Sequence, residues 1–401
     1  MSENIDKNKK ILVAMSGGVD SSVVAALLTE AGFDVTGAYM INYEETRINT
    51  DNDADINADN DSLAGHSADE GGTKACWVPD YRDALRVAAK LGIPLLKLDF
   101  QKEYKEKVLD YMLAEYKKGN TPNPDVMCNK FIKFGVWLDK IKELGFDYIA
   151  TGHYASIEEW GMGNGECEFR LMQAKDDNKD QTYFLHQLNQ EQLSKTLFPL
   201  GDYTKPEVRE LAKKFALPTA TKSESMGICF VGELDMKAFL QRDLKKNTGK
   251  IVTESGEVIG EHEGLAFYTI GKRHIGVQSS QFGVTSENKP FFVVDKNFEN
   301  NELIVGYEDS ELLNKQEIEV EDVNWISGPV HRSFSVGGQT PVFPLKCTVR
   351  LRHRQPLQEV IVKKIGEKYN LKFLTKQRAA TPGQFAVFYK DGECLGGGVI
   401  V

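Results

Sequence analysis

The chain has 401 residues, of which 41% are apolar, and its formal net charge is −10. This length predicts two or three domains, and the apolar share is enough for ordinary globular cores. The negative charge argues against a nonspecific nucleic-acid binder but allows a specific one with local basic patches. No apolar run approaches the length of a membrane span, and residues 1–10 lack the apolar core of a secretion signal. We therefore expect a cytoplasmic protein without a membrane partner.

Six cysteines stand at irregular spacing, at positions 76, 128, 167, 229, 347 and 394. A dense disulfide framework or a zinc site would need closer and more regular spacing. We therefore expect reduced thiols and no metal site built from these cysteines.

Strand and helix patterns alternate over roughly the first 230 residues. The apolar runs that predict strands cover residues 11–15, 35–41, 95–100 and 148–151, and the helical patterns cover residues 21–31, 81–91, 103–118 and 131–144. A glycine stands just past each helical pattern, where a left-handed C-cap is favoured: Gly32, Gly92, Gly119 and Gly145. This alternation predicts an α/β domain with a parallel sheet, helices on both faces and a ligand beyond the carboxyl ends of the strands.

The sequence Ser-Gly-Gly-Val-Asp-Ser-Ser at residues 16–22 joins the first predicted strand to the first helix. Gly17 and Gly18 allow a sharp turn, so that successive N–H groups and the helix N-terminus face one anion. No Gly-Lys-Ser/Thr follows, so this turn is not a Walker A loop. It resembles the pyrophosphatase loop of enzymes that split ATP into AMP and pyrophosphate. The alternative is a capped strand-to-helix turn without a ligand.

Residues 47–72 interrupt the alternation with an acidic, polar stretch that has almost no large apolar side chains. Such a stretch cannot bury enough surface to offset its ordering entropy. We expect a disordered surface insertion.

Thr121–Lys130 contains two prolines followed by Asp125 and Cys128. The prolines favour an extended approach, and Asp125 is the predicted N-cap of the next helix. Cys128 would then lie in the first turn, where the helix dipole favours the thiolate and Asp125 opposes it. Asp125 could instead act as a general base. A capped helix with a buried, inert cysteine fits this segment equally well.

Cys229 lies between Gly227 and Gly232 on a short apolar segment. Such a segment can carry a reactive sulfur or pack as a strand. Before it, Thr204 and Glu207 have the spacing of a capping box and predict a helix through about residue 216.

Beyond about residue 245 the pattern changes to short strands separated by turns, which is typical of small β domains or barrels. We predict an N-terminal catalytic domain over 1–235, a small β-rich domain over 236–307 and a C-terminal β-barrel over 308–401.

Taken together, the segments around residue 16, Cys128 and Cys229 resemble the tRNA-specific 2-thiouridylase family. Further motifs of the family stand in the right order at residues 150–154, 179–185, 267–273 and 350–355. The resemblance covers essentially the whole chain outside 47–72. It implies an adenine nucleotide α-hydrolase-like N-terminal domain and an enzyme that replaces oxygen by sulfur at C2 of the wobble uridine.

The resemblance also implies roles for individual residues. The ATP contacts would be Ala14, Met15, Ser16, Gly17, Gly18, Val19, Asp20, Ser21, Met40 and Gly152. The tRNA contacts would be Asn123, Pro124, Asp125, Lys179, Asp180, Gln181, Arg352 and His353. Cys128 would be the nucleophile and Cys229 the persulfide carrier.

The cofactors and partners follow from the same resemblance. ATP would carry Mg²⁺ between its phosphates, with Asp20 as one candidate ligand. The RNA partners would be the tRNAs for lysine, glutamate and glutamine, and the sulfur would come from a cysteine desulfurase or a sulfur relay protein. Arg350, Arg352, His353 and Arg354 alternate along a predicted strand, so they form either a solvated face or a phosphate contact, and the RNA substrate favours the second.

Two other functions fit parts of the sequence. The chain could be a different adenylating synthetase with a pyrophosphatase loop, which would not need the two cysteines. It could also be a noncatalytic tRNA-binding protein that keeps a relic nucleotide turn.

Overall fold

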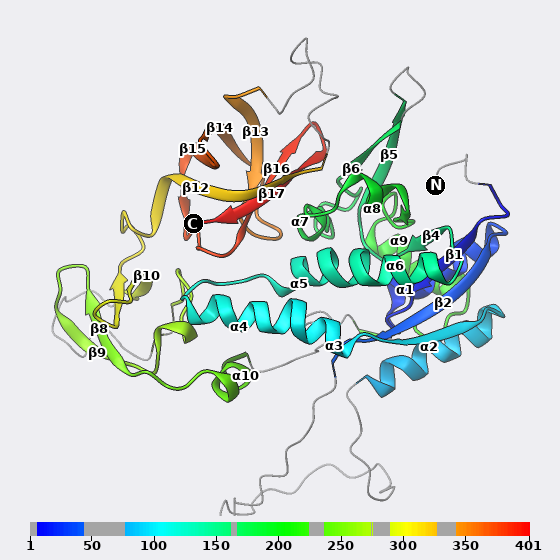
Figure 1. The fold of residues 1–401 in the computed structure, drawn as a ribbon, viewed down its shortest axis with the longest axis horizontal. Coiled ribbons are helices and arrows are strands. Elements are labelled where there is room, and N and C mark those ends of the chain that lie inside the picture. Colours follow the sequence, from blue (N-terminus) through cyan, green and yellow to red (C-terminus); the bar gives the residue numbers. More distant parts are fainter. Residues whose placement is uncertain are drawn as a thin grey trace, which may run out of the picture.

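The computed structural model describes residues 6–43, 77–161, 167–223, 236–273, 275, 289–326 and 342–401 (Figure 1). The predicted insertion at 47–72 and Cys229 lie outside these residues. So does the predicted domain boundary near 235.

A five-stranded parallel sheet forms the centre of the N-terminal part, as predicted. The strand order is β3-β2-β1-β4-β7. The strands are β1 (Lys10–Ala14), β2 (Asp34–Ile41), β3 (Leu95–Asp99), β4 (Tyr148–Ala150) and β7 (Thr196–Leu197). Side chains of β1 alternate between two cores, because Ile11 and Val13 pack on one face of the sheet and Leu12 on the other. Both faces of β1 are therefore buried.

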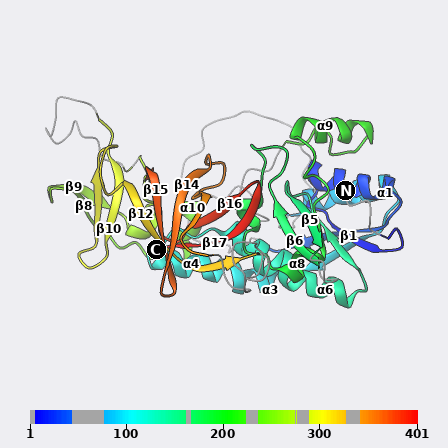
Figure 2. The ribbon, with the colours of Figure 1, turned by 90° about the horizontal axis from the view of Figure 1, so that it is seen from above.

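Helices cover the two faces of this sheet, and Figure 2 shows α9 and α6 on opposite sides. One layer contains α1 (Val19–Glu30), α2 (Val78–Leu91) and α9 (Lys205–Lys214). The other contains α3 (Gln101–Tyr104), η1 (Lys105–Leu109), α4 (Asp110–Lys117), α5 (Pro124–Met127), η2 (Cys128–Val136) and α6 (Trp137–Glu143). Two short helices, α7 (Thr182–Leu185) and α8 (Gln190–Ser194), come later in the chain.

The four glycines predicted to end helices all have positive φ, between 68° and 85°. The predicted capping box of Thr204 and Glu207 is also present, at the start of α9.

A small four-stranded sheet forms the middle β domain, on the left of Figure 1. Its order is β10-β11-β8-β9, and the strands are β8 (Gly249–Thr253), β9 (Val258–His262), β10 (Phe292–Asn297) and β11 (Glu302–Gly306). A short helix, α10 (Met236–Asp243), precedes it, and a 3-10 turn, η3 (Leu265–Phe267), follows β9. Lys296 of β10 donates to the carbonyl O of Gly119 just past α4, at 2.8 Å, and so ties this domain to the N-terminal part.

Six antiparallel strands form a closed C-terminal barrel, because β12 pairs with both β15 and β17. The strands are β12 (Asn314–Trp325), β13 (Leu345–Arg350), β14 (Gln358–Ile365), β15 (Lys368–Arg378), β16 (Phe385–Lys390) and β17 (Glu393–Ile400). Its core includes Val349, Leu371 and Phe388. Closure of the sheet removes its exposed edges. The predicted boundary near 307 falls between β11 and β12.

The barrel and the N-terminal domain share a sheet edge. A hairpin of the N-terminal domain, β5 (Ser156–Gly161) and β6 (Cys167–Met172), pairs with β17 through Leu171 and Cys394. Next to it, Tyr183 donates to the carbonyl O of Phe385 at 3.2 Å. These contacts hold the barrel against the sheet that carries the predicted nucleotide loop.

Candidate active site

A cavity of about 480 Å³ opens at the carboxyl ends of β1, β2 and β4. Strand β1 pairs with β2 on one side and with β4 on the other. The cavity therefore lies at the point of the sheet where the strand order reverses. Five basic side chains, Lys133, Lys179, Lys205, Arg209 and Arg354, and three carboxylates, Asp20, Asp80 and Asp125, line it among the described residues. The excess of cations suits an anionic ligand.

The predicted nucleotide loop forms one end of this cavity. Gly17 has φ of 74°, and a Cβ there would lie 2.2 Å from the backbone oxygen of Asp80. Only glycine therefore fits this turn without moving α2. Gly18 is the N-cap of α1, and the Ser22 hydroxyl donates to its carbonyl O at 2.7 Å. The loop presents the free N-terminus of α1, a helix of 12 residues, to the cavity.

Gly152 follows β4 and lies against the first turn of α1. A Cβ on Gly152 would come within 3.0 Å of the Ser21 nitrogen and 3.2 Å of Asp20. The ends of β1 and β4 are thus brought together as the sheet topology requires. Of the predicted ATP contacts, all but Gly17 line the cavity: Ala14, Met15, Ser16, Gly18, Val19, Asp20, Ser21, Met40 and Gly152.

Asp20 is held by two residues that the motif does not contain. Lys205, the first residue of α9, donates to both of its carboxylate oxygens, at 2.7 and 2.8 Å. The Tyr154 hydroxyl donates to Oδ1 at 2.9 Å. Lys205 thereby places a cation next to the nucleotide loop.

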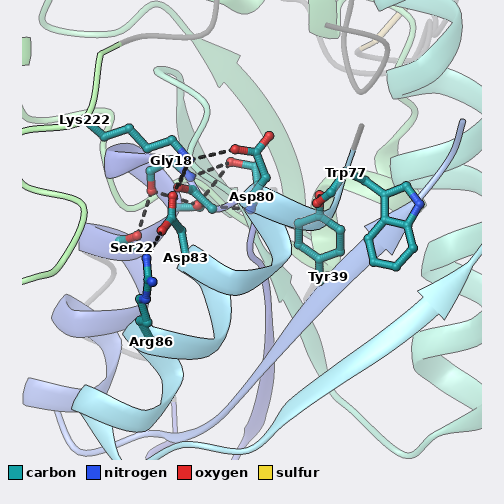
Figure 3. Close-up of polar contacts among 11 residues, drawn as sticks. Gly18, Ser22, Tyr39, Trp77, Asp80, Asp83, Arg86 and Lys222 are labelled. Atoms are coloured by element: carbon teal, nitrogen blue, oxygen red, sulfur yellow. Dashed lines mark hydrogen bonds and ion pairs between the residues drawn. The ribbon is translucent and has the colours of Figure 1, made fainter. Parts of the chain in front are cut away.

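Lys222 connects the loop to α2 (Figure 3). Its Nζ donates to the Gly17 carbonyl O at 3.1 Å, to Asp80 at 2.7 Å and to Asp83 at 2.6 Å. Burial lowers the pKa of Lys222, but the hydrogen bonds to the two aspartates outweigh it and the net shift is upward. Arg209 donates to the Lys222 carbonyl O at 2.6 Å, so the backbone here is fixed as well.

An aromatic group closes the side of the cavity near β2. Tyr39, Trp77 and Met40 line this side, and the Tyr39 hydroxyl donates to the Trp77 carbonyl O at 3.0 Å (Figure 3). The rings of Tyr39 and Trp77 lie 6.5 Å apart. Such a wall suits the apolar faces of a purine ring.

The segment around Cys128 forms another wall of the cavity. Asn123, not Asp125, is the N-cap of α5, since its side chain accepts from the Val126 nitrogen at 3.3 Å. The prediction of Asp125 as the cap was wrong, because Pro124 starts the helix two residues earlier than expected. Cys128 therefore begins the second turn, where it is 0% exposed. Its neighbours Asp125 and Asn129 both line the cavity.

Lys179 and Gln181 also line the cavity, but Asp180 between them points away from it. The Asp180 side chain is 0% exposed and forms an ion pair with Arg350 of β13. It also accepts from the hydroxyl and the backbone nitrogen of Thr182, at 2.9 and 3.3 Å. Asp180 is thus placed to orient its two neighbours.

The turn after β13 brings the barrel to the cavity. The strand ends at Arg350, which is buried in the ion pair with Asp180. The prediction that the basic residues 350–354 alternate along one exposed strand was therefore wrong. His353 and Arg354 line the cavity, whereas Arg352 donates to the Ala379 carbonyl O at 2.6 Å. Burial lowers the pKa of Arg352 and, together with nearby Arg354, lowers the pKa of His353 to about 4.

His153 also lines the cavity. Its ring packs against Phe134 and Phe198, each at a centroid distance of 5.9 Å. Its Nδ1 lies 2.7 Å from the Thr151 hydroxyl. Burial, helped by Lys133, lowers its pKa well below the usual value, so this ring is neutral at pH 7. Its packing fits a structural role.

Fold and site together define a nucleotide-binding α/β domain of the pyrophosphatase-loop class with two β domains attached. Family models support this division: "tRNA methyl transferase HUP domain" matches residues 9–233, "tRNA methyl transferase PRC-barrel domain" residues 237–307 and "Aminomethyltransferase beta-barrel domain" residues 315–400. Two relatives named tRNA-specific 2-thiouridylase MnmA, from Bacillus cytotoxicus and Streptococcus agalactiae serotype III, are each 43% identical over 98% of this chain and 94% and 96% of their own. The chain belongs to the tRNA-specific 2-thiouridylase family.

A solved structure gives a weaker likeness. The U34-tRNA thiolase NcsA from Methanococcus maripaludis is 18% identical, with a TM-score of 0.35, over 61% of this chain and 66% of its own. Among the described residues, no helix is both long and apolar enough to cross a membrane.

Proposed function

We propose that this protein replaces O2 of the wobble uridine in tRNA by sulfur in a reaction driven by ATP. The observation that carries the proposal is a single cavity with two different ends. The nucleotide loop lines the cavity and defines what we call its nucleotide end; Asp125 and Asn129, three residues before and one residue after Cys128, line it too and define what we call its RNA end. The relatives named tRNA-specific 2-thiouridylase support the same reaction.

At the nucleotide end, the N-terminus of α1 and the residues Ser16–Ser21 bind the phosphates of ATP. Met40 and the wall formed by Tyr39 and Trp77 contact the adenine ring. Lys205 and Lys222 stand close enough to the loop to offset charge that develops on the leaving pyrophosphate. Mg²⁺ arrives with ATP, and Asp20 fits as a ligand only if its contact with Lys205 loosens.

At the other end, the target base leaves its stack and enters the cavity. Asn123, Pro124, Asp125, Lys179 and Gln181 hold the RNA on one side, and Arg352 and His353 hold it from the barrel. Asp125 accepts the N3 proton of uracil while O2 attacks the α-phosphorus of ATP, so that pyrophosphate leaves and O2 carries AMP. This step makes O2 a good leaving group.

Sulfur then replaces AMP at C2. The Cys128 thiolate attacks the sulfur of Cys229 in a Cys229 persulfide and releases hydrosulfide, leaving a Cys128–Cys229 disulfide. The hydrosulfide adds to C2, and AMP leaves with O2. A dithiol reductant later supplies two electrons and two protons to restore both thiols. This disulfide requires the Cα atoms of the two cysteines to lie about 4.4–6.8 Å apart.

Replacing either cysteine tests the sulfur step. We expect Cys128→Ser and Cys229→Ser each to abolish 2-thiouridine formation while ATP binding stays nearly unchanged, and Cys347→Ser provides a control thiol on the barrel. The measurement is nucleoside mass spectrometry of tRNA incubated with protein, ATP, Mg²⁺ and a cysteine desulfurase with cysteine, which supplies the outer sulfur of the Cys229 persulfide. Full thiolation by either variant would rule out the two-thiol scheme.

The same assay separates the alternatives. A different adenylating synthetase would leave no sulfur in the RNA, and a noncatalytic binder would release no pyrophosphate when tRNA is added. Repeating the assay with purified tRNAs for lysine, glutamate and glutamine, and with a sulfur relay protein added to the desulfurase, identifies the substrates and the donor. We propose that the reaction takes place in the cytoplasm.

A further inference from the structure

Six buried polar atoms of residues that line the cavity have no hydrogen-bond partner in the described part of the chain, and two of these atoms belong to residues that contact Phe184. These two are Oδ1 of Asn129 and Nδ1 of His353. Asn129 is only 3% exposed. Buried polar atoms are nearly always paired, because an unmet hydrogen bond destabilises the folded state. Two such atoms on one wall need an explanation, and a bound ligand supplies one.

The direction of the Asn129 amide follows from its contact with Phe184. Its Nδ2 donates to the Phe184 carbonyl O at 3.0 Å. A carbonyl only accepts, so the NH₂ group must face Phe184 and the oxygen must face elsewhere. Asn129 also directly follows Cys128 and lies one helical turn after Asp125, which lines the same cavity. Its unpaired oxygen therefore belongs to the wall proposed to receive the base.

His353 approaches the same place from the barrel. Its ring lies 4.6 Å from the ring of Phe184, centroid to centroid. Because its pKa is lowered to about 4, the imidazole is neutral at pH 7 and one ring nitrogen carries a hydrogen. Phe184 thus links the two residues, with its carbonyl on Asn129 and its ring on His353.

We infer that Asn129 and His353 recognise the Watson–Crick edge of the target base and select uracil over cytosine. This inference rests on the proposed function and makes it more specific. Uracil offers a donor at N3 and an acceptor at O4, whereas cytosine offers an acceptor at N3 and a donor at the amino group. In the bound base N3–H donates to the Asn129 oxygen until Asp125, one helical turn earlier, removes that proton during adenylation, and Nδ1–H of His353 donates to O4. With cytosine two acceptors face each other at Asn129, and the contact to His353 requires the other imidazole tautomer.

A thermodynamic cycle that changes RNA and protein together tests this inference. Anticodon stem–loop RNAs that differ only in U or C at the wobble position are bound to the full chain, and the ratio of the two dissociation constants is measured. We expect the wild type to favour U by about tenfold or more, as is usual for contacts to one base edge. Asn129→Leu, which has a similar shape, should bring the ratio close to one. His353→Phe keeps a ring beside Phe184 and should give a ratio between these values.

Asn324→Leu is the matched control. Asn324 also donates its amide to backbone carbonyls, those of His186 and Leu188 at 2.9 and 3.1 Å, but it does not line the described cavity. We expect the wild-type ratio from this variant. A fraction of unfolded protein weakens binding of both RNAs equally, so the ratio reports on recognition and not on folding.

Two results would overturn the inference. One is a wild-type ratio near one, and the other is an unchanged ratio in Asn129→Leu. If the wild type thiolates the uridine RNA but shows either result, only the inference fails. If the wild type does not thiolate that RNA at all, the proposed function fails.

Discussion

The two ends of the cavity are built in different ways. The nucleotide end consists mainly of one contiguous loop, Ser16–Ser22, with Gly152 pressed against it from the neighbouring strand. The RNA end is assembled from three remote segments: the start of η2, the residues around Lys179 and the barrel turn at His353. A local sequence motif is enough to form the nucleotide end. The RNA end forms only when the barrel packs against the N-terminal domain.

The barrel supports the RNA end through buried contacts. Arg350 reaches the Asp180 carboxylate, and Gln384 donates to the Thr121 carbonyl O at 2.9 Å, just before Asn123. The barrel therefore holds both of the N-terminal segments that face it. Nucleotide binding and RNA binding should accordingly respond differently to damage at the barrel interface.

Breaking the Asp180–Arg350 pair should have the largest effect. Arg350→Met leaves a buried, unpaired carboxylate, and we expect a loss of about 3–5 kcal/mol in the free energy of unfolding. Adding Asp180→Asn removes that charge and should restore most of the stability. Denaturant unfolding measures both variants.

The double variant also separates positioning from stability. If the pair positions Lys179, Gln181 and His353, the refolded double variant should bind ATP normally but show a raised KM for tRNA. Normal kinetics with tRNA would mean that the pair serves stability alone. Equal weakening of ATP and tRNA binding would contradict the distinction between the two ends.

Gly17→Ala should damage the nucleotide end alone. Positive φ costs alanine about 1–2 kcal/mol, and the new Cβ would also collide with the Asp80 backbone. We expect ATP binding to be lost in calorimetry while RNA binding persists. Gly32→Ala is the control, because it has a similar φ of 82° with nothing within 4 Å of the new Cβ. Normal ATP affinity in Gly17→Ala would show that the turn is not the phosphate site.

Acid should weaken the contact between the barrel and the N-terminal domain through buried His186. Burial lowers the pKa of His186 to about 4, and its ring packs 4.8 Å from Phe385 of the barrel. Between pH 6.5 and 4 the unfolded chain binds this proton and the folded chain does not, so stability falls as pH falls, by up to about 1.4 kcal/mol per pH unit. His186→Asn keeps a donor toward the Tyr183 carbonyl and should flatten this slope. Identical slopes in thermal unfolding would contradict the assignment.

Local signals in the sequence were enough to predict the parallel sheet, the nucleotide loop and the capping box of Thr204. Each depends on neighbouring residues, through strand periodicity, glycine turns or a three-residue spacing. Lys205 could not be assigned to Asp20 in this way, because 185 positions separate them and only the packing of α9 on α1 brings them together.

The errors in the candidate site have the same physical origin. Arg350 looked like part of an exposed basic strand, but its partner Asp180 is supplied by another domain. The barrel over 308–401 was predicted from its general pattern of short strands, but no ranges were assigned to β12 and β15, in which many outward residues are charged and exposed. The helix cap at Asn123 was missed by two residues, since Pro124 is favoured at the first helical position and shifts the start.

The account depends on ATP and the target base sharing one cavity, and transfer of labelled AMP tests this most directly. A variant with both Cys128→Ser and Cys229→Ser is mixed with ATP labelled at the α-phosphate and a stem–loop RNA carrying the wobble uridine. We predict that label appears on the RNA, released as AMP by mild hydrolysis, and that the cytidine RNA stays unlabelled. Label that stays in ATP, or that passes to water or to the protein but never to the uridine RNA, would contradict the account.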